Sequence, residues 1–185
     1  MRTPEQWAMR VRPTIRKRLF PPRLQQDLLD IPEPDLPDIG TGLYLYGPAG
    51  SGKTVLSGFL LLHQHRQWYL ESNDQRTSKF VSVPEMFQEL KDCFSPGATQ
   101  TEREVLGHYQ GLDLLVLDDF GVTRPSDWIL QTTYLLVNYR YEHLLPTIYT
   151  SNRDLPGLED LFGDDRITSR IERSCQIKLK RKFSL

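Results

Sequence analysis

The apolar residues of the chain fall into short continuous runs, typical of buried strands, separated by stretches in which they recur at helical spacing. The run Leu112–Gly121 is rich in Leu and Val, which predicts a central parallel strand covered on both faces. Near the end of the sequence, Ile177 and Leu179 alternate with lysines, which indicates a last strand. The predicted strands are Gly42–Tyr46, Lys79–Val83, Leu112–Gly121, Pro146–Asn152 and Cys175–Phe183.

Apolar residues recur at helical spacing in most of the segments between these strands. Pro84 at a first helical position and Thr101 at an N-cap position mark two helix starts, whereas Gln67–Ser78 is expected to be a connection. Strands that alternate with helices predict an α/β domain with a parallel sheet. The predicted helices are Val55–His65, Pro84–Phe94, Thr101–Gly111 and Pro125–Leu144, with shorter helical stretches at Leu155–Phe162 and Asp164–Ser174.

The first 40 residues differ from the rest because they are polar, basic and interrupted by prolines. This composition predicts short helical pieces within Met1–Arg12 and Arg23–Leu29, followed by an extended connector over Ile31–Gly42. We expect residues 1–40 to form an N-terminal extension rather than a second domain, since they lack the apolar content for a core.

Composition excludes several classes of protein. Charge is nearly balanced, with Lys+Arg 23 against Asp+Glu 24, but basic residues gather at both ends of the sequence. Basic ends are compatible with a nucleic-acid or acidic-protein partner. A charged surface that only contacts solvent explains them equally well. Cys93 and Cys175 are too few for a disulfide framework or a zinc site. Without a long apolar run or a signal-peptide core, we expect a soluble cytoplasmic protein with no membrane partner.

The stretch Gly47–Thr54, GPAGSGKT, fits the pattern of a phosphate-binding loop. An incidental glycine-rich turn is the alternative, which the predicted strand before it and helix after it disfavour. Lys53 would reach the β- and γ-phosphates of a nucleotide, and the Thr54 hydroxyl would bind Mg²⁺. The predicted nucleotide-binding residues are Gly47, Pro48, Ala49, Gly50, Ser51, Gly52, Lys53, Thr54 and Val55.

Further polar residues follow two of the predicted strands. Leu114–Leu117 followed by two acids resembles the Walker B motif of P-loop ATPases. In that motif Asp118 would hold Mg²⁺, and Asp119 stands where most of these ATPases place a Glu that orients and deprotonates the attacking water. Asn152 would touch the γ-phosphate or this water, or else cap the following turn. Arg166 and Arg170, four residues apart on one helix face, would match acids of their own helix or reach into a neighbouring subunit.

In this order and at these intervals, GPAGSGKT, LLVLDDFG, TSN and RITSR resemble the motifs of AAA+ ATPases. KFVSVPEMFQELK and DDFG are similar to segments of the DnaC/DnaI/IstB group, the helicase loaders and transposition helper ATPases, and the resemblance covers Gly42–Lys180. It implies a three-layer αβα P-loop NTPase fold with a five-stranded parallel sheet of order 5-1-4-3-2. It also implies ATP and Mg²⁺ as cofactors, and residues 41–185 as an AAA+ ATPase domain without a C-terminal lid domain.

For the site, the resemblance implies that Lys53, Asp119 and Asn152 act in catalysis, with Asn152 as sensor 1. It makes Arg170 the trans-acting arginine finger and Arg166 a second arginine of the same box. A head-to-tail homo-oligomer follows, because a finger completes the site of a neighbour. Since Asp is one methylene shorter than Glu, we expect ATP hydrolysis with Asp119 as the base to be slow.

Two functions fit these motifs. The first is an ATP-dependent loader that places a hexameric replicative helicase on single-stranded DNA, in a cellular, phage or mobile-element version. The alternative is an IstB-like helper that binds duplex DNA and regulates a transposase. A small-molecule kinase is disfavoured, because the residues after Arg170 are too few to form an acceptor-binding lid.

Overall fold

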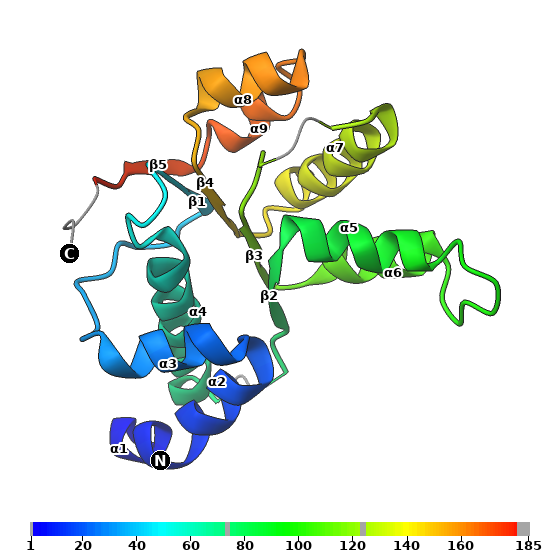
Figure 1. Ribbon diagram of the computed structural model, residues 1–185. Helices are drawn as coiled ribbons and strands as arrows, with labels where there is room; N and C mark the ends of the chain where they lie inside the picture. Colours follow the sequence, from blue (N-terminus) through cyan, green and yellow to red (C-terminus); the bar gives the residue numbers. More distant parts are fainter. Residues whose placement is uncertain (1, 73–74, 123–124, 181–185) are drawn as a thin grey trace.

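A five-stranded parallel sheet forms the middle layer of the protein (Figure 1). It is seen in a computed structural model that describes residues 2–72, 75–122 and 125–180. The strand order β2-β3-β4-β1-β5 is the predicted order read from the opposite edge, so the predicted fold class is confirmed. The strands are β1 (Gly42–Tyr46), β2 (Ser78–Ser82), β3 (Leu114–Asp118), β4 (Thr147–Ser151) and β5 (Cys175–Lys178).

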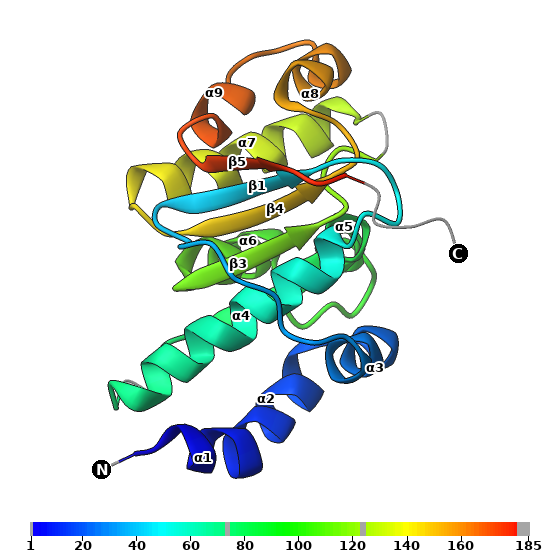
Figure 2. The ribbon, with the colours of Figure 1, turned by 90° about the vertical axis from the view of Figure 1, so that its left-hand side faces the viewer.

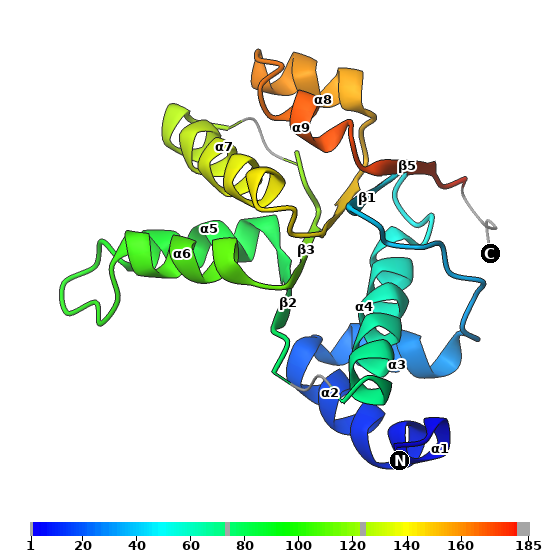
Figure 3. The ribbon, with the colours of Figure 1, turned by 180° about the vertical axis from the view of Figure 1, so that it is seen from behind.

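Helices cover both faces of the sheet (Figure 3). The central strand shows how the core is divided: Leu115 and Leu117 pack into the cluster on one face, whereas Leu114 and Val116 pack into the cluster on the other. Because successive side chains of a strand point to opposite faces, a continuous apolar run is what a strand covered on both sides requires. The face of Leu114 is covered by α4 (Lys53–Leu70), and the face of Leu115 by α5 (Val83–Asp92), α6 (Glu102–Gly111), α7 (Asp127–Glu142), α8 (Leu155–Phe162) and α9 (Thr168–Ile171).

The structure corrects two predicted boundaries in the middle of the chain. Helix α4 continues to Leu70, through residues predicted as a connection, because Trp68 is buried edge-on against His65 and Tyr69 packs on Trp7. Strand β3 stops at Asp118 rather than at Gly121, because Asp119 turns the backbone into the left-handed region with φ of 59°.

Two predictions near the end of the chain were too long. Of the predicted helical stretch Asp164–Ser174, only α9 is helical, and Arg166 lies in the turn before it. The predicted strand Cys175–Phe183 extends to Lys178, and its last three residues lie outside the described part of the chain. Among the described helices, none has the length and apolar character needed to cross a membrane.

The N-terminal residues form helices that pack on α4 (Figure 2). Three of the buried residues of this segment, Phe20, Leu24 and Leu28, join the same cluster as the apolar side chains of α4. The prolines of this segment predict breaks between short pieces, and at Pro13 this prediction is wrong: helical turns are continuous from Pro4 to Leu19, and a π-helical turn ends at Val11, two residues before this proline. These elements are α1 (Pro4–Gln6), the π-helix η1 (Trp7–Val11), α2 (Arg12–Leu19) and α3 (Pro22–Asp30), followed by the predicted extended connector.

Arg140 is a buried charge that ties α6, α7 and β4 together. Its side chain is 1% exposed, and its guanidinium donates to five oxygen atoms. Burial lowers the pKa of Arg140 to about 10, which leaves it charged at neutral pH. The acceptors are Thr147 Oγ1 and the carbonyls of Tyr109, Gln110, Leu112 and Pro146, at 2.7–3.1 Å.

Candidate nucleotide-binding site

The loop between β1 and α4 has the conformation that phosphate binding requires. Gly50 and Gly52 adopt φ of 76° and 88°, a region that residues with a Cβ rarely enter. Helix α4 begins at Lys53 with Gly52 as its N-cap, so the unpaired N–H groups of its first turn face the loop. The predicted nucleotide-binding residues Gly47–Val55 therefore lie together at the carboxyl edge of the sheet, where the dipole of α4 attracts an anion.

Lys53 lies at the centre of this loop with its ammonium group among oxygen atoms. Its Nζ donates to the carbonyls of Gly47 and Pro48 and to Asn152 Oδ1, each at 2.9 Å. Burial lowers the pKa of Lys53, and the charges of Asp119 and Asp118 partly oppose this shift. The contact with Asn152 brings the predicted sensor residue at the end of β4 to the phosphate-binding loop.

Thr54 and Asp118, the two predicted Mg²⁺ ligands, are in direct contact. The Thr54 hydroxyl donates to Asp118 Oδ1 at 3.0 Å, and the Asp118 side chain is almost fully buried. Burial raises the pKa of Asp118, while hydrogen bonds from Thr150 and Thr54 favour its charged form. A hydroxyl and a carboxylate side by side supply the hard oxygen ligands that Mg²⁺ prefers.

Asp119 differs from its neighbour because its side chain is exposed. Its left-handed backbone directs the chain away from β3, and its N–H donates to Thr150 Oγ1 at 3.0 Å. A non-glycine residue in this region costs on the order of 1 kcal/mol or more, so the surrounding contacts must hold it there. The carboxylate is thereby presented at the edge of the site, beside the buried Asp118.

Thr150 is a site residue that the sequence analysis did not single out. Its buried hydroxyl donates to Asp118 Oδ1 at 2.6 Å and accepts from the Asp119 N–H, so it fixes both acids relative to β4. The signal was available, because β3 and β4 pair in parallel, with Leu117 opposite Tyr149. The next pair along, Asp118 and Thr150, places a hydroxyl on a buried strand beside a buried acid.

The residues at this edge suit a nucleotide with its metal ion. Gly50 and Gly52 are exposed, and an ideal Cβ at either would meet nothing within 4 Å, so this part of the loop is open to a ligand. Within the described part of the chain, the buried cation of Lys53 has only oxygen partners, which phosphate oxygens can replace. This edge therefore combines anion-binding donors with a pair of oxygen ligands for a divalent cation.

Arg166 and Arg170 are held together, but away from this edge. Both guanidinium groups lie over the ring of Tyr134 on α7, at 5.2 Å and 5.0 Å from its centre. Arg170 lines a cavity of about 430 Å³ together with Thr41 and Thr147, which lie where β1 and β4 begin. Since the phosphate-binding loop follows the end of β1, Arg170 lies towards the opposite edge of the sheet.

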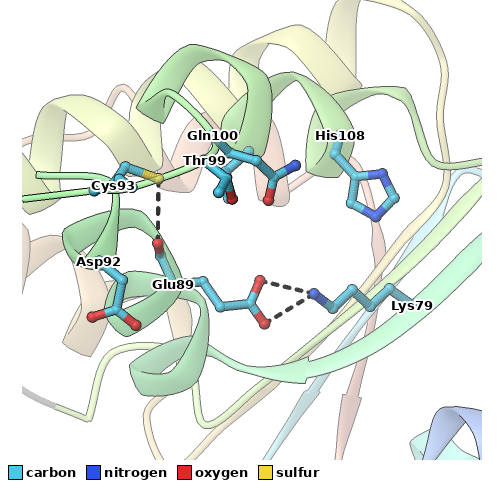
Figure 4. A pocket seen from close by; sticks show the side chains of 10 residues that line it. Lys79, Glu89, Asp92, Cys93, Thr99, Gln100 and His108 are labelled. Atoms are coloured by element: carbon cyan, nitrogen blue, oxygen red, sulfur yellow. Dashed lines mark hydrogen bonds and ion pairs between the residues drawn. The ribbon is translucent and has the colours of Figure 1, made fainter. Parts of the chain in front are cut away.

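A second cavity, of about 590 Å³, lies between α5 and α6, outside the nucleotide site (Figure 4). Glu89 and Lys79 form an ion pair of 2.9 Å on one side of it, opposite Gln100 and His108. Tyr109 binds both members of this pair, at 2.6 Å and 2.7 Å. The charges of Lys79 and Glu89 are satisfied by one another, and the other charged residue of the lining is Asp92, whose carboxylate would repel the phosphates of a nucleotide.

Comparison with known proteins assigns a family to this arrangement. The replicative helicase loader DnaI of Bacillus subtilis (strain 168) is 32% identical over 114 residues, which cover 61% of this chain and 33% of that protein. The phage-like element PBSX protein XkdC of the same strain is 28% identical over 136 residues, covering 71% and 46% of the two chains. The chain thus spans a third to a half of the length of these relatives.

Solved structures show the same fold. A crystal structure of the DnaC helicase loader matches 85% of this chain and 89% of its own chain, with a TM-score of 0.61 at 24% identity. A crystal structure of DnaI matches 86% and 81%, with a TM-score of 0.59 at 26% identity. Residues 36–175 match the family described as IstB-like ATP binding protein. The chain belongs to this family of ATP-binding proteins, with an AAA+ P-loop fold.

Proposed function

We propose that this protein is an ATP-dependent helicase loader, which binds a hexameric replicative helicase and assists its placement on single-stranded DNA. The arrangement of two half-sites supports this proposal: Lys53, Asp118 and Asn152 gather at one edge of the sheet, while Arg170 lies towards the other. Helicase loaders among the relatives, at modest identity, support the same role. We place its action in the cytoplasm.

Within the nucleotide site, each residue has a defined task. The backbone N–H groups of Gly47–Val55 and the ammonium of Lys53 bind the phosphates, and Thr54 and Asp118 hold Mg²⁺. Mg²⁺ held there would neutralise charge on the phosphates of ATP, whose γ-phosphoryl group is transferred to water with ADP as the leaving group. Asp119 orients this water and accepts its proton, and Asn152 positions it beside the γ-phosphate. The shorter side chain of Asp119 makes hydrolysis slow.

The position of Arg170 supports head-to-tail assembly. Because it lies towards the edge opposite its own phosphate-binding loop, it would serve the site of a neighbouring subunit. Arg166 lies beside it as the second arginine of the interface. ATP bound between two subunits therefore joins them, and the assembly reports ATP to the helicase.

Exposed basic residues support contact with DNA. Arg10, Lys17, Arg18 and Arg23 are exposed on the N-terminal helices, and Lys178 and Lys180 on and after β5. Such side chains bind phosphate groups of single-stranded DNA without reading sequence. Affinity for an oligonucleotide of mixed sequence should fall steeply as salt is raised.

The decisive test is size-exclusion chromatography with a replicative helicase, ATP and Mg²⁺. We expect co-migration with ATP and separation without it, and the Lys53→Ala variant should not co-migrate under either condition. Failure to bind the replicative helicases of every candidate host would refute the loader role.

The family match favours one alternative, an ATP-dependent helper that assembles on duplex DNA and regulates a transposase. Electrophoretic mobility shift assays separate the two functions. Cooperative, ATP-dependent binding to long duplex DNA would favour the helper, whereas helicase binding with a weak preference for single strands favours the loader.

A further inference from the structure

The guanidinium of Arg170 is held by a set of three neutral oxygen atoms. Its Nε donates to Asn138 Oδ1 at 2.5 Å, and its Nη2 donates to Tyr134 Oη at 3.3 Å. Its Nη1 donates to the carbonyl of Arg166 at 2.6 Å. Tyr134 and Asn138 are one helical turn apart on α7, so they present a single face to Arg170.

Arg166 provides a contrast on the same tyrosine ring. Its guanidinium forms an ion pair with the carboxylate of Asp164 at 2.5 Å, which neutralises its charge locally. Among the described residues, Arg170 has no ion pair of this kind, and its hydrogen-bond partners carry no charge. Of the two arginines, Arg170 therefore keeps its positive charge available for an anion.

Arg170 also keeps hydrogen-bond donors. A guanidinium has five N–H donors, and the three bonds use one on each nitrogen, which leaves one on each terminal nitrogen. Two donors on adjacent terminal nitrogens match the bidentate geometry by which arginine binds phosphate oxygens. The fixed side chain is thus compatible with phosphate binding, without first breaking the contacts to α7.

We infer that Tyr134 and Asn138 are positioning residues, which hold Arg170 ready for the ATP site of the neighbouring subunit. This inference rests on the proposed trans role of Arg170. A free arginine side chain loses rotamer entropy when it is fixed, and the contacts to α7 remove that loss before the subunits meet. Positioning acts on the rate of hydrolysis, because ATP itself is bound by the loop of the other subunit.

The test uses mixed assemblies of two inactive variants. Donor subunits carry Lys53→Ala, which keeps Arg170 but removes nucleotide binding, and acceptor subunits carry Arg170→Ala, which keeps the nucleotide site. ATPase activity should return on mixing, because each donor finger completes an acceptor site. Failure of this complementation would refute the trans role, and the inference with it.

Asn138→Ala is then added to one partner at a time. In the donor it should lower the kcat of the mixture about ten-fold or more, with KM for ATP unchanged, since misplacement of a catalytic group by about 1 Å can cost about 100-fold. In the acceptor, where Arg170 is absent, it should have no such effect. Tyr134→Phe in the donor, which removes one weak hydrogen bond and keeps the ring, should lower kcat about two- to three-fold.

Gln131→Ala, an exposed amide on the same helix, is the matched control and should leave the rate unchanged. Thermal denaturation of each variant checks that the subunit is folded. If complementation succeeds and the donor Asn138→Ala leaves kcat unchanged, Asn138 is only a structural contact and the inference is wrong. A higher kcat would mean that these contacts restrain the finger, and would overturn the inference as well.

Discussion

The two ends of the sheet hold functional groups in different ways. At the carboxyl edge, hydrogen bonds join Lys53 to Asn152, and both Thr54 and Thr150 to Asp118; Lys53, Asp118 and Thr150 are buried. Towards the other edge, Arg166 and Arg170 lie on the surface of α7. Side chains that bond one another are satisfied within one subunit, whereas a surface arginine can act on a second. In the proposed head-to-tail assembly, each subunit would carry one half of two different sites.

Lys53→Ala should have the largest effect, because it removes the cation that contacts both the loop and Asn152. We expect nucleotide binding to fall below detection, measured by fluorescence titration with a labelled ATP analogue. Lys17→Ala, an exposed lysine on α2, is the control and should bind normally. Undiminished binding by Lys53→Ala would show that the loop is not the nucleotide site.

Arg170→Ala should separate ATP binding, which needs the loop of the same subunit, from ATP hydrolysis, which needs the arginine of a neighbour. ATP binding to the isolated subunit should be unchanged, while hydrolysis in the assembly falls about 1,000-fold, as expected for loss of an arginine finger. Steady-state phosphate release and nucleotide titration measure the two properties. Weaker ATP binding by the monomeric variant would contradict the assignment of Arg170 to the neighbour's site.

Arg140→Met and Arg170→Ala together test whether the buried Arg140 contributes more to the free energy of unfolding than the half-buried Arg170. Removing the Arg140 guanidinium leaves five buried oxygen acceptors without their donor, which should lower the free energy of unfolding by about 3 kcal/mol or more. Arg170→Ala should cost less than about 1 kcal/mol in the same urea titration, because its side chain is only half-buried. Equal costs would remove the distinction between a structural and a functional arginine.

Thr150→Val tests the link between the two acids. The change keeps the shape of the side chain but leaves the Asp119 N–H and a buried carboxylate oxygen without this partner, at a cost of about 1–3 kcal/mol in unfolding free energy. Hydrolysis should fall together with stability, while Thr150→Ser, which retains the hydroxyl, should preserve both. Normal hydrolysis by the valine variant would show that Thr150 does not position the acids.

The smallest expected effect concerns pH and His65, a buried residue of α4 bonded to Ser78. Burial and the nearby charge of Arg18 lower the pKa of His65 from 6.5 to about 4. As the pH falls, His65 is therefore protonated in the unfolded chain before it is protonated in the folded chain. Its contribution to the free energy of unfolding is present above pH 6.5 and is lost as the pH falls towards 4. Between pH 7 and 6 the loss should be on the order of 1 kcal/mol.

Urea titrations of the wild type and of His65→Gln would measure this loss, because the variant lacks the titrating group. The same loss should appear in Arg170→Ala, whose arginine is not among the groups that shift this pKa. An identical pH dependence in the wild type and in His65→Gln would contradict the assignment.

Much of the nucleotide site could be predicted because its parts are local in sequence. Gly47–Thr54 directly follows a strand and contains the turn and the helix start, and the two acids lie at the end of the most apolar strand. Contacts between strands were harder to predict, because they depend on register. Thr150 was missed for this reason, although it lies beside Asp118 in the sheet.

The sequence by itself determined the order of strands and helices and the identity of the phosphate-binding loop, since apolar periodicity and glycine spacing act over a few residues. Only the tertiary structure decided where α4 ends, how the N-terminal helices pack and which groups hold Arg170. Each of these depends on side chains distant in sequence, such as Trp7 against Tyr69 and Asn138 against Arg170. Their free energy arises from burial and hydrogen bonding between elements, which no local pattern encodes.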